Sequence, residues 1–239
     1  MYNTFIFDLD GTLLDTLQDL ANSVNHALRV HDMPVHSMDD IRCFVGNGVR
    51  KLMERAIPDG AQNPDFEKVF ADFRQHYMHH SLDTTRPYNG IPEVIHELKQ
   101  RGCRLAVVSN KMMAATQQLV AHFFPEIDVA IGEHEAAGIR KKPAPDTVIE
   151  ALRQLGISTD HSLLASCNSL LDAAVYVGDS DVDIETARNS GLPCISVLWG
   201  FRTRDFLLAH GATTLISSPS ELLSVTPVTP KKNEHPSTT

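Results

Sequence analysis

Two carboxylates, Asp8 and Asp10, follow a short apolar run and lead directly into a Gly-Thr turn. A spacing of two on an extended chain places both side chains on one face. A carboxylate in apolar surroundings is costly unless it is paired with a cation or bound to a metal. The sequence therefore predicts a prepared anionic site at the end of an N-terminal strand.

Further polar side chains follow two other apolar runs. Ser109 comes directly after the predicted strand 104–108, and Asp179 and Asp183 follow the predicted strand 173–177. Because ligands of open parallel sheets bind beyond the carboxyl ends of the strands, we expect these groups to meet the first two carboxylates in space. Three carboxylates beside oxygen-rich loops suit a hard cation, most simply Mg²⁺.

A lysine completes the candidate set. Lys142 lies just before a helix predicted to begin at Pro145 and to end at Leu155. An ammonium group near a serine hydroxyl and backbone N–H groups can hold a phosphate. Lys141 and Lys111 are weaker candidates, and the alternative interpretation is that they are ordinary surface charges.

The order of the elements indicates an α/β fold. Apolar runs alternate with helical patterns, which predicts a doubly wound parallel sheet with right-handed crossovers. The predicted strands are 4–8, 104–108, 129–131, 173–177 and 194–198. We expect one core domain built from residues 1–13 and 83–225.

Residues 14–82 show helical periodicity and form a predicted all-helical cap domain inserted after the first strand. Ser37-Met-Asp-Asp40 is typical of a capping box at a helix start. The aromatic stripe from Phe66 to Tyr77 is interpreted as core. Residues 226–239, with three prolines and no periodicity, form a predicted disordered tail.

The composition narrows the class of protein. The formal net charge of −9 disfavours general binding to nucleic acid or to an anionic membrane surface. No apolar run approaches the length of a membrane span, and no basic region precedes the first apolar stretch. The four cysteines lack C-x-x-C spacing, which favours free thiols in a reducing cytoplasm. We expect a cytoplasmic monomer or homodimer.

Four ordered motifs together resemble the haloacid dehalogenase superfamily, and specifically its phosphoglycolate phosphatase group. The Asp-x-Asp-Gly-Thr motif matches Asp8 to Thr12, and the strand ending in Ser or Thr matches Ser109. The Lys-Pro-x-Pro motif begins at Lys142, and Gly-Asp-Ser-x-x-Asp ends at Asp183. The resemblance covers roughly residues 1–225.

The resemblance implies a role for each matched position. Asp8 is the expected nucleophile, which forms an aspartyl-phosphate, and Asp10 is the expected general acid and base. Asp8, the backbone carbonyl of Asp10, and Asp179 are the expected Mg²⁺ ligands. Ser180 and Asp183 are expected to act on the metal indirectly, by positioning its ligands or through a water molecule.

The same resemblance implies how a small phosphorylated substrate is held. Ser109 and Lys142 are expected to bind the transferring phosphoryl oxygens, with Thr12 and Asn110 as further contacts. In the cap, Phe44-Val-Gly-Asn-Gly48 resembles a specificity loop that closes over the substrate. This places Gly46, Asn47 and Gly48 in the substrate site; the alternative is a plain helix–helix turn. The neighbouring Arg50 and Lys51 could attract a second substrate anion.

The expected reaction is Mg²⁺-dependent hydrolysis of a small phosphomonoester, with 2-phosphoglycolate as the leading substrate. The resemblance supports this reaction through Asp10. Dehalogenase relatives carry Tyr at that position and phosphonatase relatives carry Ala, and neither residue can act as an acid for an alkoxide leaving group. The alternatives within the superfamily are a sugar phosphate, nucleotide or pyrophosphate substrate, or a β-phosphoglucomutase-like mutase reaction. A catalytically silent phosphate- or partner-binding protein is the alternative outside enzymes. Segment 157–172 is longer than in typical relatives.

Overall fold

The sheet at the centre of the computed structural model is six-stranded, and every strand pairs in parallel with its neighbours. The structure describes residues 1–157 and 173–226. The strand order is β5-β4-β1-β6-β7-β8. These strands are β1 (Thr4–Phe7), β4 (Arg104–Met112), β5 (Val129–Glu133), β6 (Ala174–Gly178), β7 (Cys194–Val197) and β8 (Thr214–Ile216). The predicted parallel α/β core is confirmed.

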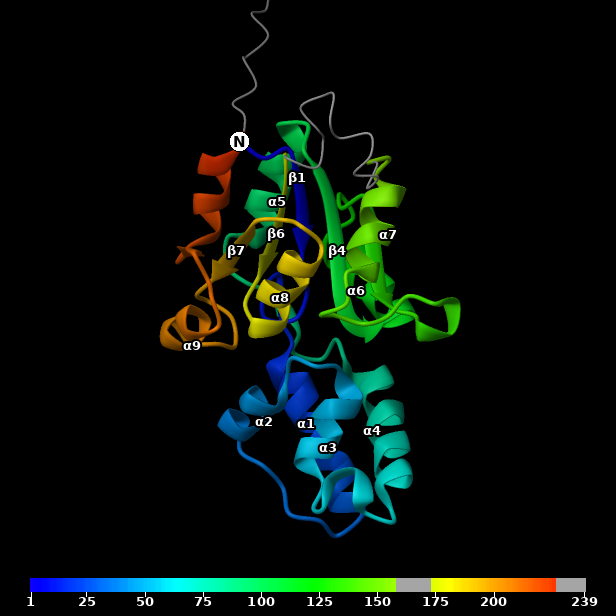
Figure 1. The fold of residues 1–239 in the computed structure, drawn as a ribbon. Coiled ribbons are helices and arrows are strands. Elements are labelled where there is room, and N and C mark those ends of the chain that lie inside the picture. The colour runs from blue at the N-terminus through cyan, green and yellow to red at the C-terminus, as the bar shows by residue number, and fades with distance from the viewer. Residues whose placement is uncertain (158–172, 227–239) are drawn as a thin grey trace, which may run out of the picture.

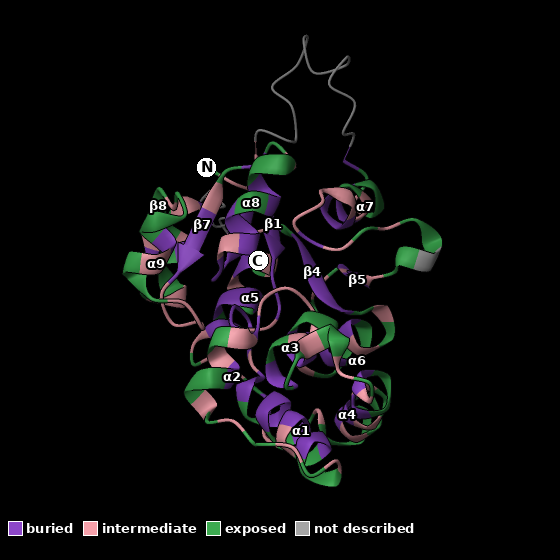
Figure 2. Ribbon diagram, turned by 60° about the horizontal axis from the view of Figure 1, so that its bottom comes forward, coloured by how far each residue is buried: buried purple, intermediate pink, exposed green. Residues whose placement is uncertain are grey.

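Helices cover both faces of this sheet (Figure 1). Phe5 and Phe7 pack with apolar side chains of α5 and α6 on one face, whereas Ile6 packs with α7 and α8 on the other. This alternation follows from the period of two along a strand. Figure 2 shows β4 and β7 buried among helices whose outer sides are exposed. The helices are α5 (Ile91–Gln100), α6 (Met113–Phe123), α7 (Asp146–Gln154), α8 (Asp181–Asn189) and α9 (Arg204–Ala209).

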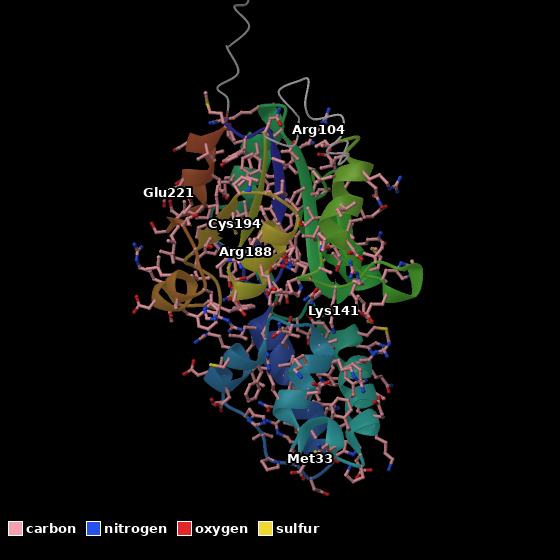
Figure 3. The ribbon with its side chains drawn as sticks, viewed as in Figure 1. Met33, Arg104, Lys141, Arg188, Cys194 and Glu221 are labelled. Carbon is pink, nitrogen blue, oxygen red and sulfur yellow. The ribbon has the colours of Figure 1, made fainter. Side chains whose placement is uncertain are left out.

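A helical lobe, defined here as α1 to α4, lies beyond the C-terminal ends of the strands in Figure 1. It has its own apolar cluster, which includes Leu28, Leu52 and the aromatic stripe that ends at Tyr77. Figure 3 places Met33 at the far end of this lobe and Lys141 where the lobe meets the core. Its helices are α1 (Leu17–Val30), α2 (Met38–Phe44), α3 (Val49–Ala56) and α4 (Phe66–His80).

Two chain segments connect the lobe to the core, and they pair with each other. β2 (Leu14–Asp15) is antiparallel to β3 (Arg86–Pro87), so the all-helical prediction for 14–82 is wrong at its first two residues. Beside this ladder, the buried carboxylate of Asp19 accepts hydrogen bonds from the backbone and hydroxyl groups of Thr84 and Thr85. These bonds join the beginning of the lobe to its end. The predicted capping box at Ser37 is confirmed.

Several elements differ from the sequence prediction. β4 extends to Met112, with an irregularity in its pairing after Val108, because the polar residues that follow remain extended. β8, α9 and the 3₁₀ helix η3 (Pro219–Val225) were not predicted, since such short elements carry little periodicity. Thr226, predicted to begin the disordered tail, is buried and accepts a hydrogen bond from Arg101.

Some predictions lie outside the described residues: those for 158–172 and for the tail beyond Thr226, together with Cys167. Within the described ranges, no helix combines the length and the apolar character needed to cross a membrane. Cys43, Cys103 and Cys194 are free thiols, as predicted.

Candidate active site

The predicted carboxylates meet at the carboxyl edge of the sheet. Asp8 follows β1 directly and Asp179 follows β6, and these two strands are neighbours in the sheet. Ser109 lies on β4, which pairs with β1 on its other side. These residues, with Asp10 and Lys142, line one cavity of about 50 Å³. The topology thus brings together residues that are more than a hundred positions apart in the sequence.

Lys142 is the electrostatic centre of the site. Its ammonium lies 2.6 Å from Oδ1 of Asp8 and 2.8 Å from Oδ1 of Asp183, and it also donates to the hydroxyl of Tyr176 at 3.1 Å. Its side chain is 4% exposed. Burial alone would lower the pKa of Lys142, but the carboxylates of Asp183 and Asp8 raise it above its ordinary value. The lysine is therefore held charged between two carboxylates.

The carboxylates outnumber the cation that faces them. Burial and the nearby charge of Asp183 raise the pKa of Asp8 well above its ordinary value, although Lys142 opposes this shift. Burial and the charge of Asp183 also raise the pKa of Asp179, to about 7. The hydrogen bond from the backbone N–H of Phe201 acts in the opposite direction and lowers this pKa. In the absence of a further positive charge, the ionised forms of Asp8 and Asp179 are destabilised by each other and by their surroundings.

Asp183 is fixed by the start of helix α8. Its Oδ2 accepts hydrogen bonds from the hydroxyl of Ser180 at 2.6 Å and from the backbone N–H groups of Asp179 and Ser180. Ser180 and Asp183 form a capping box. Tyr176, within β6, donates to Asp183 Oδ1 at 2.9 Å. Sequence reasoning missed Tyr176, although a tyrosine in a buried apolar strand requires a partner for its hydroxyl.

Asp179 is held by side chains and backbone that close around it. Thr12 donates its hydroxyl to Oδ1 at 3.3 Å, and the backbone N–H of Phe201 donates to Oδ2 at 2.6 Å. Thr12 is fully buried, is not among the residues that line the cavity, and positions Asp179; its contact with the substrate stays a prediction. At Gly11, with φ of +92°, a Cβ would lie 2.5 Å from Oδ2 of Asp179.

The donor set fits a divalent cation. Asp8, Asp179 and Asp183 each offer one carboxylate oxygen, and these three oxygens lie within 4.8 Å of one another. Hard divalent cations prefer such oxygen ligands, and a cation would favour the ionised forms that burial opposes. Asp10 differs, because its side chain lies apart from this group. Its Oδ1 is 3.3 Å from the ammonium of Lys111.

The polar end of β4 positions two lysines. Asn110 donates to the carbonyl of Lys142 at 3.0 Å and accepts from its N–H at 2.7 Å, which fixes the Lys142 backbone. Lys111 is 4% exposed and donates to the hydroxyl of Tyr77 on α4 at 2.6 Å. The interpretation of Lys111 as a surface charge is therefore wrong. Ser109, 1% exposed, lines the cavity and accepts from the N–H of Lys111.

The loop between α2 and α3 reaches the cavity through its glycines. Gly46 and Gly48 line the cavity, and their contact with the substrate stays a prediction. Asn47 is not among the lining residues, and its side chain accepts a hydrogen bond from Arg55 at 2.7 Å; its contact with the substrate stays a prediction.

The two predicted anion attractors lie on the outer surface of α3. Arg50 pairs with Glu67 at 2.6 Å and Lys51 pairs with Glu54 at the same distance, and both basic residues are exposed. Neither lines the cavity. The attraction of a second substrate anion by Arg50 and Lys51 stays a prediction that these ion pairs do not support.

A family model described as haloacid dehalogenase-like hydrolase matches residues 5–197, which is most of the chain. The chain belongs to the haloacid dehalogenase-like hydrolase family. The match spans all four predicted motifs and the helical lobe. This membership agrees with the resemblance inferred from the motifs.

Individual relatives of this haloacid dehalogenase-like hydrolase cover most of its length. A phosphoglycolate phosphatase of Aquifex aeolicus is 31% identical over 198 residues, covering 82% of this chain and 84% of the relative. An N-acetylmuramic acid 6-phosphate phosphatase of Pseudomonas aeruginosa is 28% identical over 230 residues, covering 92% of each chain. A crystal structure from Lactobacillus delbrueckii subsp. bulgaricus has a TM-score of 0.82 and 36% identity, covering 92% and 96% of the two chains.

Proposed function

We propose that this protein is a Mg²⁺-dependent phosphomonoester hydrolase that acts through an aspartyl-phosphate intermediate. The observation that carries the proposal is the buried ammonium of Lys142, held at 2.6 Å from Asp8 beside a cluster of carboxylates. Such a site suits phosphoryl transfer, in which catalysis depends mostly on positioning and on neutralising charge.

In the proposed reaction, Asp8 attacks phosphorus and the bond to the ester oxygen breaks, so that the phosphoryl group is carried on the Asp8 carboxylate. Asp10 donates a proton to the leaving oxygen. Asp10 then removes a proton from a water molecule that attacks the aspartyl-phosphate, which releases inorganic phosphate and restores Asp8. Ser109 and Lys142 hold the phosphoryl oxygens during both steps.

The Mg²⁺ ion would be held by Asp8, the backbone carbonyl of Asp10, and Asp179. Asp183 would support these ligands without being one of the three. The bound cation supplies positive charge that offsets the repulsion between Asp8 and an anionic phosphate. Asp183 and Ser180 hold the loop after β6, and Asn110 holds the loop that carries Lys142.

The leading substrate in this proposal is 2-phosphoglycolate. The Aquifex relative is named for this activity, which supports the choice of substrate. We further propose that the protein is a monomer or homodimer and that it works in the cytoplasm; the free thiols of Cys43, Cys103 and Cys194 support this location.

The proposal is tested by measuring kcat/KM with Mg²⁺ for 2-phosphoglycolate, hexose phosphates, nucleoside monophosphates, pyrophosphate and N-acetylmuramic acid 6-phosphate. We expect the highest value for 2-phosphoglycolate. A higher value for another ester would keep the chemistry and change the substrate. A complete lack of turnover across the panel would support a silent binding protein instead.

A further inference from the structure

The cavity contains a third cation, Arg202, that the proposed chemistry does not use. Arg202 lies in the segment between β7 and α9, and it lines the cavity together with Lys142 and Lys111. Its side chain is 13% exposed. Resting on the function proposed above, we propose that Arg202 determines specificity by binding a second anionic group of the substrate, a carboxylate on the leaving-group side.

The charges around the cavity support this assignment. Lys142 is neutralised by Asp8 and Asp183, and Lys111 lies 3.3 Å from Asp10. Arg202 pairs with Asp181 at the long distance of 4.0 Å, and solvent partly screens this pair because the Asp181 side chain is 36% exposed. The charge of Arg202 also acts on Asp179, whose pKa it lowers. Of these three cations, Arg202 thus has the least neutralised charge.

The donors of Arg202 are not saturated either. Its two Nη atoms donate to the backbone carbonyls of Arg42 at 2.8 Å and Val45 at 2.5 Å. Its Nε is buried and has no hydrogen-bond partner within the described residues. A buried donor without a partner costs free energy, and a carboxylate can accept from it while supplying the missing charge.

The same side chain connects the core to the loop that borders the cavity. Arg42 and Val45 lie at the end of α2, immediately before Gly46. A Cβ at Gly46 would lie 3.2 Å from an Nη atom of Arg202, and Gly46 has a φ of +130°. The guanidinium therefore packs against the loop backbone. A carboxylate bound to Arg202 would lie between the loop and the phosphoryl site.

The test compares two substrates of nearly equal size, 2-phosphoglycolate and 2-phosphoglycolamide, in which a neutral amide replaces the carboxylate and the phosphate is unchanged. The measured quantity is the ratio of their kcat/KM values in the presence of Mg²⁺. For Arg202→Gln we expect this ratio to fall by roughly 10- to 100-fold, the range for loss of a charge-assisted hydrogen bond. Turnover of the amide is expected to persist, which shows that the variant folds.

Two further variants keep the test sharp. Arg202→Lys retains the charge but cannot reach both carbonyls, so it should keep part of the ratio. Arg204→Gln removes an exposed arginine two residues away and should leave the ratio at the wild-type value.

The inference is overturned if Arg202→Gln lowers kcat/KM equally for both substrates, since Arg202 would then only position the loop. It is also overturned if Arg50→Gln, and not Arg202→Gln, removes the preference for 2-phosphoglycolate over its amide. Failure of the proposed function looks different, because wild-type protein would then hydrolyse neither substrate.

Discussion

The ammonium of Lys111 lies 3.3 Å from Oδ1 of Asp10, the proposed general acid and base. The same ammonium donates to the hydroxyl of Tyr77 and lies 4.6 Å from the centroid of its ring. Lys111 belongs to the core, whereas Tyr77 belongs to α4 of the helical lobe. The position of the lobe is thereby connected to Asp10, the carboxylate that transfers protons in the proposed reaction.

Tyr77→Phe is expected to lower kcat and the free energy of unfolding, since it removes an acceptor from the buried ammonium of Lys111. An unsatisfied buried donor costs about 1–3 kcal/mol. Urea unfolding and steady-state kinetics measure both effects. The matched control is Tyr2→Phe, because Tyr2 lies before the start of β1, at the end of the strand away from the active site. Equal kcat values for Tyr77→Phe and wild type would disconnect the lobe from Asp10.

Asp8→Asn is expected to abolish turnover while the fold persists. The amide cannot act as the proposed nucleophile, and its neutral form relieves the repulsion among the buried carboxylates of Asp8, Asp179 and Asp183. We therefore expect the melting temperature of the metal-free variant to equal or exceed that of wild type. Circular dichroism confirms the fold, and turnover at near the wild-type rate would exclude Asp8 as the nucleophile.

Local sequence was sufficient to locate the residues at strand ends. Asp8 and Asp179 each follow a short apolar run, and the parallel order of the strands then requires that they meet. The buried polar partners of these residues were harder to predict. Tyr176 lies inside an apolar run, where nothing local distinguishes a tyrosine that bonds to Asp183 from one that only packs.

The same limit applies to the cations. Lys111 resembles a surface lysine in the sequence, because its partners Asp10 and Tyr77 lie on distant segments. Arg202 belongs to no motif, and it becomes significant only when its segment meets the end of α2. In contrast, Arg50 seemed suitable because it is near Gly46–Gly48 in sequence, but the helix turns it toward Glu67.

Gly11→Ala is expected to weaken divalent-cation binding by roughly 10- to 100-fold, as for loss of a group that orients a metal ligand. The added Cβ would lie 2.5 Å from Asp179 Oδ2, so this carboxylate must move. Gly191→Ala is the matched control, because Gly191 also has a positive φ, of +70°, but open space at its Cβ. Calorimetric titration with Mg²⁺ measures the affinities. Equal losses in both variants would assign the effect to backbone strain instead of displacement of Asp179.

The stability of the metal-free protein is expected to fall as the pH rises from about 4 to about 7. Burial and Asp183 raise the pKa of Asp179 to about 7 in the folded state, above its ordinary value of 3.8. The folded protein then binds this proton more tightly than the unfolded chain does. The resulting stabilisation is fully present below the ordinary pKa of 3.8 and is lost as the pH rises through the folded-state pKa of about 7. The raised pKa of Asp8 acts in the same direction.

This prediction is checked by thermal unfolding of chelator-treated protein between pH 4.5 and 8. Asp179→Asn cannot titrate at this position, so its melting temperature should decline less steeply with pH than that of wild type. Added Mg²⁺ should flatten the wild-type curve, because a cation binds the ionised carboxylates and stabilises the folded state by mass action. Parallel curves for the two metal-free proteins would show that Asp179 is ionised throughout this range.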